Sequence, residues 1–233
     1  TPDPAVIAVS ADPAAVDTLP QGPIYRGWWG EIAGSASGTG LTGGLAIAED
    51  PAVATDAAGV RYIAWADGRN GNLEIYVARQ SGSGWEMLGG SAQGGGVSAS
   101  AASSLRPSLA LDAGGAPVVA WVETLGGTAD IRAARFDAGT GTWNALGDSL
   151  SAAGISGSGK ADRPAILSTA SGVVVAWLDR TSGVGQVHAK RFDGAAWVHL
   201  GTEALTDPVR GVLEFSLATD GTGYWKLNVS ILA

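Results

Sequence analysis

Hydrophobic residues along this chain fall in short runs, and each run ends at a cluster of Gly, Pro, Asp or Ser. Two of the runs, Pro117–Glu123 and Val173–Asp179, consist almost entirely of apolar side chains rich in valine. A short apolar run between turn residues predicts a β-strand that is buried on both faces. The spacing of an amphipathic helix is missing from the sequence. The pattern therefore predicts an all-β protein.

The runs belong to a unit that repeats. A tryptophan in the middle of a strand recurs at Trp65, Trp121 and Trp177, with a constant spacing of 56 residues. A second tryptophan, followed by x-x-Leu-Gly, recurs later in each unit, at Trp85, Trp143 and Trp197. A long fixed period is typical of stacked supersecondary units. Four short antiparallel strands in each unit predict one blade of a β-propeller.

Each unit contains four expected strands. In the second unit they are Pro107–Asp112, Pro117–Glu123, Ile131–Phe136 and Trp143–Gly147. In the first unit they are Pro51–Asp56, Arg61–Asp67, Glu74–Arg79 and Trp85–Gly89. In the third unit they are Pro164–Leu167, Val173–Asp179, Val187–Phe192 and Trp197–Gly201.

The sequence predicts one propeller domain over residues 1–233, with repeats at about 50–105, 106–162 and 163–210. The chain ends resemble two halves of a fourth unit. We expect two inner strands at Phe215–Asp220 and Tyr224–Ile231, and two outer strands at Ala5–Ser10 and Ile24–Gly34. A composite blade from 211–233 and 1–34 would close a four-bladed ring and protect the sheet edges. The alternative is a fragment of a larger ring.

Three long connectors join each outer strand to the next inner strand: Gly34–Glu49, Gly89–Leu105 and Gly147–Asp162. Loops of this length inside compact domains are usually functional or disordered. In a propeller they emerge on the same rim as the hairpins between the second and third strands, so this rim is the expected ligand face. The alternative is that the connectors only bridge the blades.

Charged residues also recur. An acidic residue ends the second strand of each unit, at Asp67, Glu123 and Asp179, while Arg106 and Arg163 precede the prolines of the first strands. The expected hairpin register places Arg106 opposite Glu123 and Arg163 opposite Asp179. These pairs are interpreted as salt bridges that lock each hairpin. The alternative is a ring of arginines that binds a carboxylate ligand.

The first unit departs from this pattern, because Asp50 stands where the other units have arginine. Asp50 is expected to face Asp67, with Glu49 beside it. Carboxylates without a cation between them repel each other, and a bound Ca²⁺ would relieve that repulsion. Alternatively, Arg61 or Arg69 neutralises the pair. Calcium bound by Glu49, Asp50 and Asp67 is the one candidate cofactor.

The tryptophans divide into two classes. Trp65, Trp121 and Trp177 lie within apolar runs and are predicted to fill the space between blades. Trp85, Trp143 and Trp197 begin the outermost strands, where they either pack in the core or form a shallow platform that stacks on sugar rings.

Candidate catalytic residues are few. The two histidines, His188 and His199, have no metal-ligand spacing and are interpreted as surface or hairpin residues. The sequence contains no nucleophile elbow and no phosphate-binding loop. These observations predict that the chain is not an enzyme.

Composition narrows the range of partners. The formal net charge is −8, with 22 acidic and 14 basic side chains, which disfavours nucleic acid and anionic membranes. No apolar run is long enough to insert across a bilayer. The chain contains no cysteine, so disulfides and thiolate metal sites are excluded. A composition rich in Gly, Ala, Ser and Thr favours an extracellular or periplasmic location.

Two stretches resemble known repeats. IYVARQSGSGWEMLGGS at Ile75–Ser91 and VHAKRFDGAAWVHLG at Val187–Gly201 resemble bacterial propeller lectins of the fucose-binding Photorhabdus type. That resemblance implies sugar binding between blades without catalysis. AWADGRNGNLEIYVAR at Ala64–Arg79 is similar to the blades of sialidase-like propellers. The corresponding tyrosine nucleophile and its glutamate partner cannot be assigned here.

The sequence thus predicts a secreted, non-catalytic β-propeller that binds a glycan or another extracellular protein. The candidate ligand residues are Trp85, Trp143, Trp197, Arg106, Arg163, Glu123 and Asp179. One alternative is a structural or scaffolding subunit of an extracellular assembly. A second alternative is a sialidase-like glycosidase.

Overall fold

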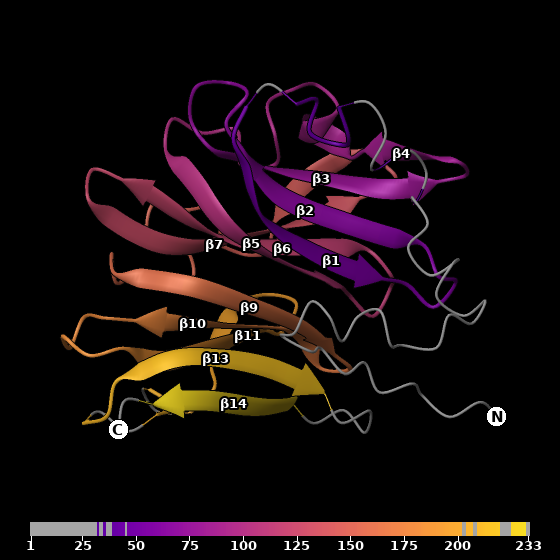
Figure 1. The fold of residues 1–233 in the computed structure, drawn as a ribbon. Helices are drawn as coiled ribbons and strands as arrows, with labels where there is room; N and C mark the ends of the chain where they lie inside the picture. Colours follow the sequence, from indigo (N-terminus) through magenta and orange to yellow (C-terminus); the bar gives the residue numbers. More distant parts are fainter. Residues whose placement is uncertain are drawn as a thin grey trace, which may run out of the picture.

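The computed structural model describes residues 32, 35, 39–44, 46–201, 204–206, 209–219 and 225–231. They form a β-propeller of three four-stranded antiparallel sheets and one two-stranded sheet, each with its strands in chain order (Figure 1). The one helical segment among the described residues is a short 3₁₀ turn at Gly89–Ser91. None of the described residues forms a helix long and apolar enough to cross a membrane.

Each sheet is one blade, or part of one. Blade 1 contains β1 (Ala48–Thr55), β2 (Arg61–Asp67), β3 (Glu74–Ser81) and β4 (Gly84–Met87). Blade 2 contains β5 (Ser103–Leu111), β6 (Pro117–Leu125), β7 (Thr128–Asp137) and β8 (Thr142–Ala145). Blade 3 contains β9 (Ala161–Thr169), β10 (Gly172–Asp179), β11 (Gln186–Phe192) and β12 (Trp197–His199). The last pair is β13 (Val212–Thr219) and β14 (Trp225–Ile231).

The expected strands of the three complete units are therefore confirmed, and so are the two expected near the C-terminal end. An aspartate sets the first turn of the blade in two units. The Asp56 side chain accepts hydrogen bonds from the amides of Ala58 and Val60. In the same way, the Asp112 side chain accepts hydrogen bonds from the amides of Gly114 and Ala116. Such side-chain bonds to the following backbone favour tight turns.

The predicted pairing of β1, β5 and β9 with their neighbours is wrong. Glu123 lies opposite Ser104, Asp179 opposite Ala161, and Asp67 opposite Ala48. The expected pairs Arg106–Glu123, Arg163–Asp179 and Asp50–Asp67 are therefore not formed.

The shift has two parts: the hairpin turn moves the pairing by one residue, since Leu111 lies opposite Pro117, and a β-bulge before each inner-strand proline adds a second. Asp50, Arg106 and Arg163 have positive φ values of 54°, 51° and 50°. The register of each hairpin changes at this point. A bulge adds one unpaired residue and turns the side chains around it. A proline disfavours the right-handed helical conformation at the residue before it, so the sequence allows this bulge without requiring it.

The two inner-strand arginines contact the following blade instead of their own hairpin. Arg106 forms an ion pair with Asp162 of β9, and Arg180 also reaches that carboxylate at 3.1 Å. Arg163 donates a 2.9 Å hydrogen bond to the carbonyl of Leu213 in β13. These side chains therefore join neighbouring blades.

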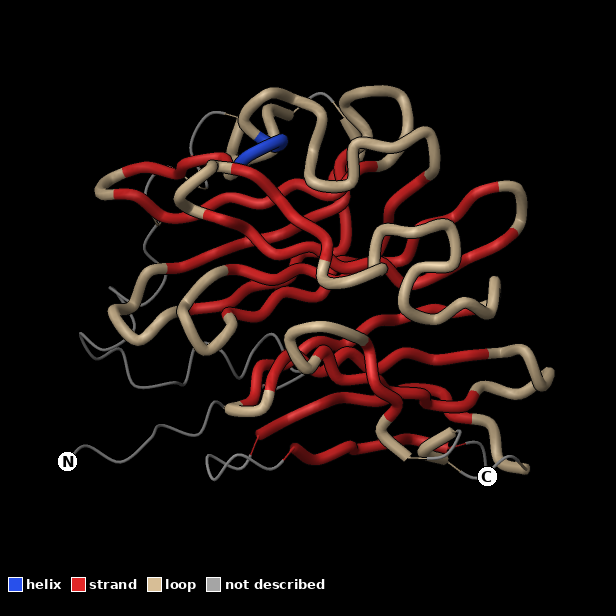
Figure 2. Tube along the Cα trace, turned by 180° about the vertical axis from the view of Figure 1, so that it is seen from behind, coloured by secondary structure: helices blue, strands red, loops and turns tan. Residues whose placement is uncertain are grey.

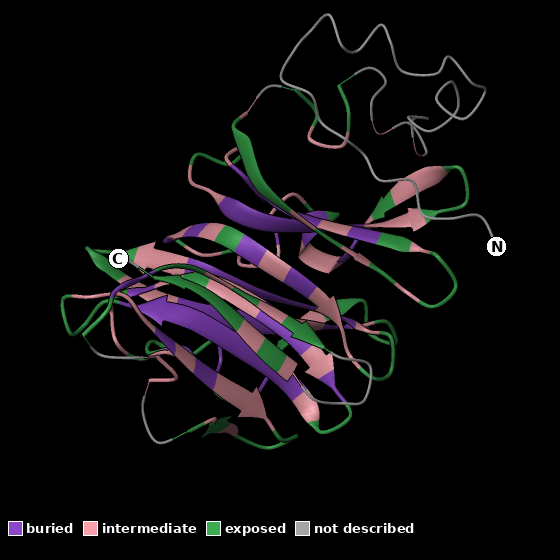
Figure 3. Cartoon of the chain, turned by 60° about the horizontal axis from the view of Figure 1, so that its bottom comes forward, coloured by how far each residue is buried: buried purple, intermediate pink, exposed green. Residues whose placement is uncertain are grey.

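The mid-strand tryptophans are buried, and Trp121 and Trp177 fill the space between blades, as predicted; the described neighbours of Trp65 lie in its own blade. Trp65, Trp121 and Trp177 are 3%, 1% and 2% exposed. Trp121 packs in a cluster with Tyr62 and Val77 of blade 1, and Trp177 packs in a cluster with residues of blade 2. The buried residues, purple in Figure 3, follow the middle strands of the blades.

The outer tryptophans join each blade to the preceding unit. Each is partly buried, and each donates its indole N–H to a carbonyl. The acceptors are Ile32 for Trp85 (3.0 Å), Leu88 for Trp143 (3.1 Å) and Leu146 for Trp197 (2.7 Å). The carbonyl of Ile32 thus accepts from Trp85 the same hydrogen bond that the leucine carbonyls of the Trp-x-x-Leu motifs accept from the tryptophan of the next blade. Apart from Ile32, the predicted outer strands Ala5–Ser10 and Ile24–Gly34 lie outside the described residues, so closure of the ring stays a prediction.

The long connectors are held against the third strand of their own blade. The short β4 pairs only with the second half of β3, and the connector forms hydrogen bonds with the first half. The amide of Val97 donates to the carbonyl of Ile75 at 2.6 Å, and Ser98 Oγ accepts from the amide of Ile75 at 2.9 Å. The same two bonds recur in blade 2 with Ile155 and Ser156, and in blade 3 with Leu205 and Thr206. These bonds satisfy backbone groups at the strand edge, and the connectors lie beside the strand ends as ordered loops (Figure 2).

Candidate functional site

Each complete blade presents the same three positions near the connector rim. The first is the buried tryptophan, and the second is the acid two residues later, Asp67, Glu123 or Asp179. The third is the residue opposite the tryptophan on the next strand, which is Tyr76, Arg132 or His188. Because side chains alternate along a strand, all three lie on one face of the sheet. The blades therefore offer three versions of one site.

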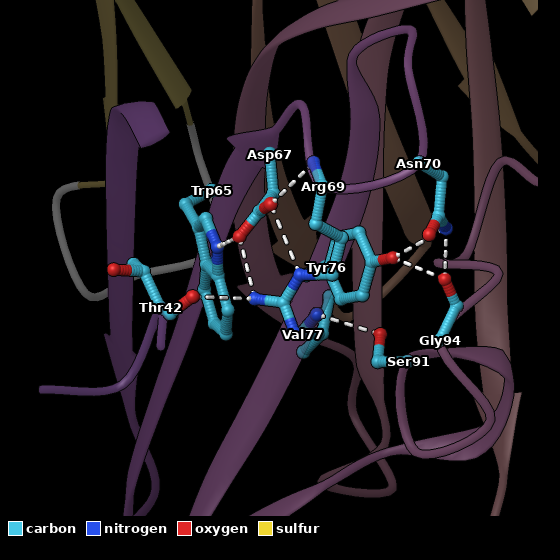
Figure 4. A network of polar contacts seen from close by, with 9 residues as sticks. All are labelled: Thr42, Trp65, Asp67, Arg69, Asn70, Tyr76, Val77, Ser91 and Gly94. Atoms are coloured by element: carbon cyan, nitrogen blue, oxygen red, sulfur yellow. Dashed lines mark hydrogen bonds and ion pairs between the residues drawn. The ribbon is translucent and has the colours of Figure 1, made fainter. Parts of the chain in front are cut away.

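In blade 1 an arginine holds the carboxylate (Figure 4). Arg69 donates from Nε to Asp67 Oδ1 at 3.0 Å and from Nη2 to Oδ2 at 2.6 Å. Trp65 Nε1 also donates to Oδ2, at 2.9 Å. The guanidinium of Arg69 lies 4.3 Å above the centre of the Tyr76 ring. With its side chain 1% exposed, Asp67 is closed off from any ligand.

These contacts decide the charge of the pair. Burial raises the pKa of Asp67, but hydrogen bonds from Arg69 and Trp65 outweigh burial and lower that pKa overall. Neutralisation by Arg69, one of the two outcomes considered for Asp67, is therefore the one observed. Asp50 takes no part in it. Among the described residues, no three His, Asp or Glu side chains gather closely enough to hold a metal ion.

The rest of the blade 1 site joins its hairpin to the connector. Asn70 Nδ2 donates to the Tyr76 hydroxyl at 3.0 Å, and that hydroxyl donates to the carbonyl of Gly94. The amide of Val77 donates to Ser91 Oγ at 2.9 Å (Figure 4). The carboxylate of Asp67 and the hydroxyl of Tyr76 are thus both bonded within the fold.

In blade 2 an arginine again holds the acid, although it comes from a different strand. Arg132 of β7 contacts Glu123 Oε1 at 3.2 Å and donates to the carbonyl of Ala152 at 3.0 Å. The Arg132 side chain is 10% exposed. Glu123 is therefore also neutralised from inside the protein.

In blade 3 the acid has no such partner. Asp179 is 6% exposed and accepts a 2.8 Å hydrogen bond from the amide of Thr181, but no Lys or Arg in the described chain forms an ion pair with it. Thr181 stands where blade 1 has Arg69, and His188 stands where blade 2 has Arg132. The His188 ring lies parallel to that of Trp177, with centroids 6.0 Å apart. Within the described residues, Trp177 Nε1 has no hydrogen-bond partner.

The ionisation of the blade 3 groups follows from their surroundings. Burial raises the pKa of Asp179, but hydrogen bonds from Ser158 and Thr181 outweigh burial and lower that pKa, so the group is an anion at neutral pH. Burial lowers the pKa of His199, and the nearby charges of Lys190 and His188 lower it further. His199 is therefore neutral under the same conditions.

These groups line one cleft of about 400 Å³. Its walls come from β10, β11, β12 and the connector that leaves blade 2. An aromatic surface with a few convergent polar groups is the usual composition of a small-molecule site. The lining residues are Ser156, Ser158, Trp177, Asp179, Thr181, Ser182, Gln186, His188 and His199.

Of the candidate site residues from the sequence, Asp179 lies in this cleft. The structure does not bring the others to it. Glu123 is paired in blade 2, Arg106 and Arg163 lie on inner strands, and the outer tryptophans Trp85, Trp143 and Trp197 bond to the preceding unit. The sequence interpretation missed His188 and His199. Spacing could have found His188, because it follows Tyr76 and Arg132 at intervals of 56 residues.

Comparison with known proteins gives no matching family model and no matching curated protein. Solved structures do match. An endo-arabinase from Bacteroides thetaiotaomicron is 18% identical, with a TM-score of 0.50, over 77% of this chain and 68% of that one. An α-L-arabinanase from Penicillium chrysogenum, complexed with arabinobiose, is 12% identical, with a TM-score of 0.51, over 79% and 57%. An α-L-arabinofuranosidase from Fusarium graminearum is 8% identical, with a TM-score of 0.51, over 79% and 56%.

At these identities the likeness shows a shared fold, the β-propeller. The chain spans less than two thirds of the Penicillium and Fusarium enzymes. The matches nevertheless overturn the prediction that the chain is not an enzyme. That prediction rested on missing sequence motifs, whereas these three proteins of the same fold are named as enzymes that act on arabinose-containing substrates.

Proposed function

We propose that this chain is an extracellular β-propeller that acts on carbohydrate and binds its sugar in the blade 3 cleft. One observation carries the proposal: a carboxylate, an indole, two imidazoles and several hydroxyls line a single opening of about 400 Å³. The equivalent positions in blades 1 and 2 are closed by Arg69 and Arg132.

The chemistry of this lining suits a sugar. A sugar ring carries hydroxyls that both donate and accept, together with an apolar face. The carboxylate of Asp179 and the neutral imidazole of His199 can accept from hydroxyls, and the side chain of Gln186 can donate as well as accept. The neighbouring rings of Trp177 and His188 offer an aromatic surface.

Charge supports the same assignment. The only described acid in the cleft lining is the unpaired Asp179, and the whole chain carries a formal charge of −8. Both disfavour phosphate-rich ligands such as nucleic acid. The low content of charged residues, 15%, is in keeping with an extracellular setting.

The test is calorimetric titration of the full chain with a panel of oligosaccharides that includes arabinobiose, while reducing ends are counted to report cleavage. Asp179→Asn and His199→Ala should each weaken binding about tenfold or more, because each removes a polar contact worth about 1.5 kcal/mol. Glu86→Gln on the exposed outer strand β4 is the matched control and should bind like the parent. The proposal fails if no saccharide binds, or if the cleft variants and the control bind alike.

A further inference from the structure

Two of the three rim carboxylates are occupied by a guanidinium that belongs to the protein. Arg69 binds Asp67 in blade 1, and Arg132 binds Glu123 in blade 2. The third carboxylate, Asp179, has the same position on its strand and nearly the same burial, yet the arginine of blade 1 is replaced by Thr181, which gives the carboxylate hydrogen bonds but no positive charge.

We infer that the sugar bound in the blade 3 cleft carries a primary amine, and that its ammonium group binds Asp179 as the guanidinium of Arg69 binds Asp67. This inference rests on the proposed function and specifies the class of sugar. It assigns an amino sugar in place of a neutral or acidic one.

Burial gives the first argument. Acidic side chains are almost never fully buried unless they are paired, because removing an ion from water costs several kcal/mol. Asp179 is only 6% exposed and accepts hydrogen bonds from Ser158 and Thr181. His188 adds a weaker electrostatic contribution, and no Lys or Arg of the described chain forms an ion pair with this carboxylate. A cation at this carboxylate would supply the partner that its two counterparts already have.

The aromatic surface gives the second argument. In blade 1 the Trp65 and Tyr76 rings are stacked, with centroids 5.9 Å apart, and the guanidinium of Arg69 lies over the tyrosine. In blade 3 the Trp177 and His188 rings are stacked in the same way, at 6.0 Å. The tryptophan face of blade 1 is thus repeated beside the unpaired acid, with His188 in place of the tyrosine, and the face of a tryptophan attracts cations.

The rest of the cleft lining also favours a ligand with one positive charge. Where blades 1 and 2 have a second acid, Glu74 or Asp130, blade 3 has the neutral Gln186. The cleft therefore holds one anion, which matches one ammonium group. The indole N–H of Trp177 remains as a donor for a sugar oxygen. The net charge of −8 would also attract a polycationic glycan at long range.

The experiment compares three matched ligands by calorimetry on the full chain: glucosamine oligomers, their N-acetylated counterparts and cello-oligosaccharides of equal length. The glucosamine oligomers should bind at least about tenfold more tightly than the other two, which corresponds to about 1.4 kcal/mol. Asp179→Asn should remove this preference, because it removes the charge and keeps the shape.

Thr181→Arg supplies a second variant. It rebuilds the Asp67–Arg69 arrangement in blade 3, so it should abolish binding of the glucosamine oligomers and leave the melting temperature equal or higher. Thr181→Gln is the matched control, since it adds length without charge and should keep the preference for the amine. Circular dichroism confirms that each variant is folded.

The outcomes separate this inference from the proposed function. If the three ligands bind equally and Asp179→Asn weakens all three to the same extent, the amine is ruled out while sugar binding in the cleft stands. If no oligosaccharide binds but methylguanidinium does, and Thr181→Arg abolishes that binding, the cation site stands and the sugar assignment fails. If neither class of probe binds, both proposals are overturned.

Discussion

Blades 1 and 3 are built from the same unit, but they use their rim acid in opposite ways. In blade 1 the carboxylate of Asp67 is bonded to Trp65 and doubly to Arg69, and its side chain is 1% exposed. In blade 3 the carboxylate of Asp179 lines an open cleft and meets the amide of Thr181. One arginine, present two residues after the acid in one blade and replaced by threonine in the other, accounts for most of this difference.

The comparison shows how a repeat protein can obtain a site without a new fold. The strand, the tryptophan and the acid are retained in both blades, and the tryptophan is buried in each. Without the internal cation, a carboxylate that the rest of the blade already holds in place has no ion-pair partner. If the internal cation is what separates the two blades, matched substitutions in blades 1 and 3 should have different effects.

The largest effect is expected from removing the cation of blade 1. Arg69→Ala leaves the buried carboxylate of Asp67 without its charge partner, and breaking a buried pair in this way costs about 3 kcal/mol or more. Thr181→Ala in blade 3 removes no ion pair and should cost less than about 1 kcal/mol. Urea unfolding of both variants measures the difference. Equal losses of unfolding free energy would mean that the arginine does not distinguish the blades.

The next effect concerns the indole N–H groups. Trp65 donates to an ionised carboxylate, whereas Trp177 Nε1 has no partner within the described residues. Both replacements by phenylalanine leave a similar cavity, so the hydrogen bond is the main difference. We expect Trp65→Phe to cost about 2 kcal/mol more than Trp177→Phe in urea unfolding.

Trp121→Phe provides the internal control for that pair. Its indole N–H is also without a partner in the described chain, so its loss should match that of Trp177→Phe. If Trp121 behaves like Trp65 instead, the extra cost of Trp65→Phe does not come from the bond to Asp67.

Much of this architecture could be predicted from the sequence, because strand burial and turn chemistry are local properties. The run Pro117–Glu123 became β6, Pro117–Leu125, and the three mid-strand tryptophans are buried. The register of the inner strands could not be predicted. It depends in part on a bulge at Asp50, Arg106 and Arg163, and since arginine seldom adopts positive φ, the identity of two of these residues gives no sign of it.

The candidate site was only partly predictable for a different reason. The repeat pattern pointed to Asp179, but its distinction from Asp67 and Glu123 depends on which arginine folds back on which acid. Arg69 comes from the hairpin, and the sequence interpretation named it only as one of two arginines that could neutralise Asp67. Arg132 comes from the opposite strand, and the sequence interpretation did not pair it with Glu123. His188 and His199 lie on different strands, and only the folded blade brings both to one cleft.

Acid titration gives a third test of the comparison. The pKa of Asp67 is lowered in the folded state, so its contribution to stability is complete above the unfolded value of about 3.9 and is lost as the pH falls through the lower folded value. Asp67→Asn should therefore flatten the dependence of the unfolding free energy on pH below about pH 4. Asp179→Asn should flatten it as well, since the pKa of Asp179 is also lowered.

Urea unfolding at a series of acidic pH values measures both slopes. Glu86→Gln, whose carboxylate is exposed on β4, is the control and should leave the slope nearly unchanged. An unchanged slope in Asp67→Asn would show that the folded protein does not stabilise that carboxylate, and the contrast between the blades would lose its electrostatic basis.

The smallest effect concerns the connector clamp. Ser98 Oγ accepts from the amide of Ile75 and donates to the carboxylate of Glu74, whereas Thr206 Oγ1 accepts from the amide of Val187 in a blade where Gln186 replaces that acid. Because a bond to a charged group is stronger than a bond to a neutral one, Ser98→Ala should cost about 1 kcal/mol more than Thr206→Ala. Hydrogen exchange of the Ile75 and Val187 amides reports each clamp directly. If both variants lose protection and stability equally, the acid of β3 adds nothing to the clamp, and the rims of blades 1 and 3 differ only at Asp67 and Asp179.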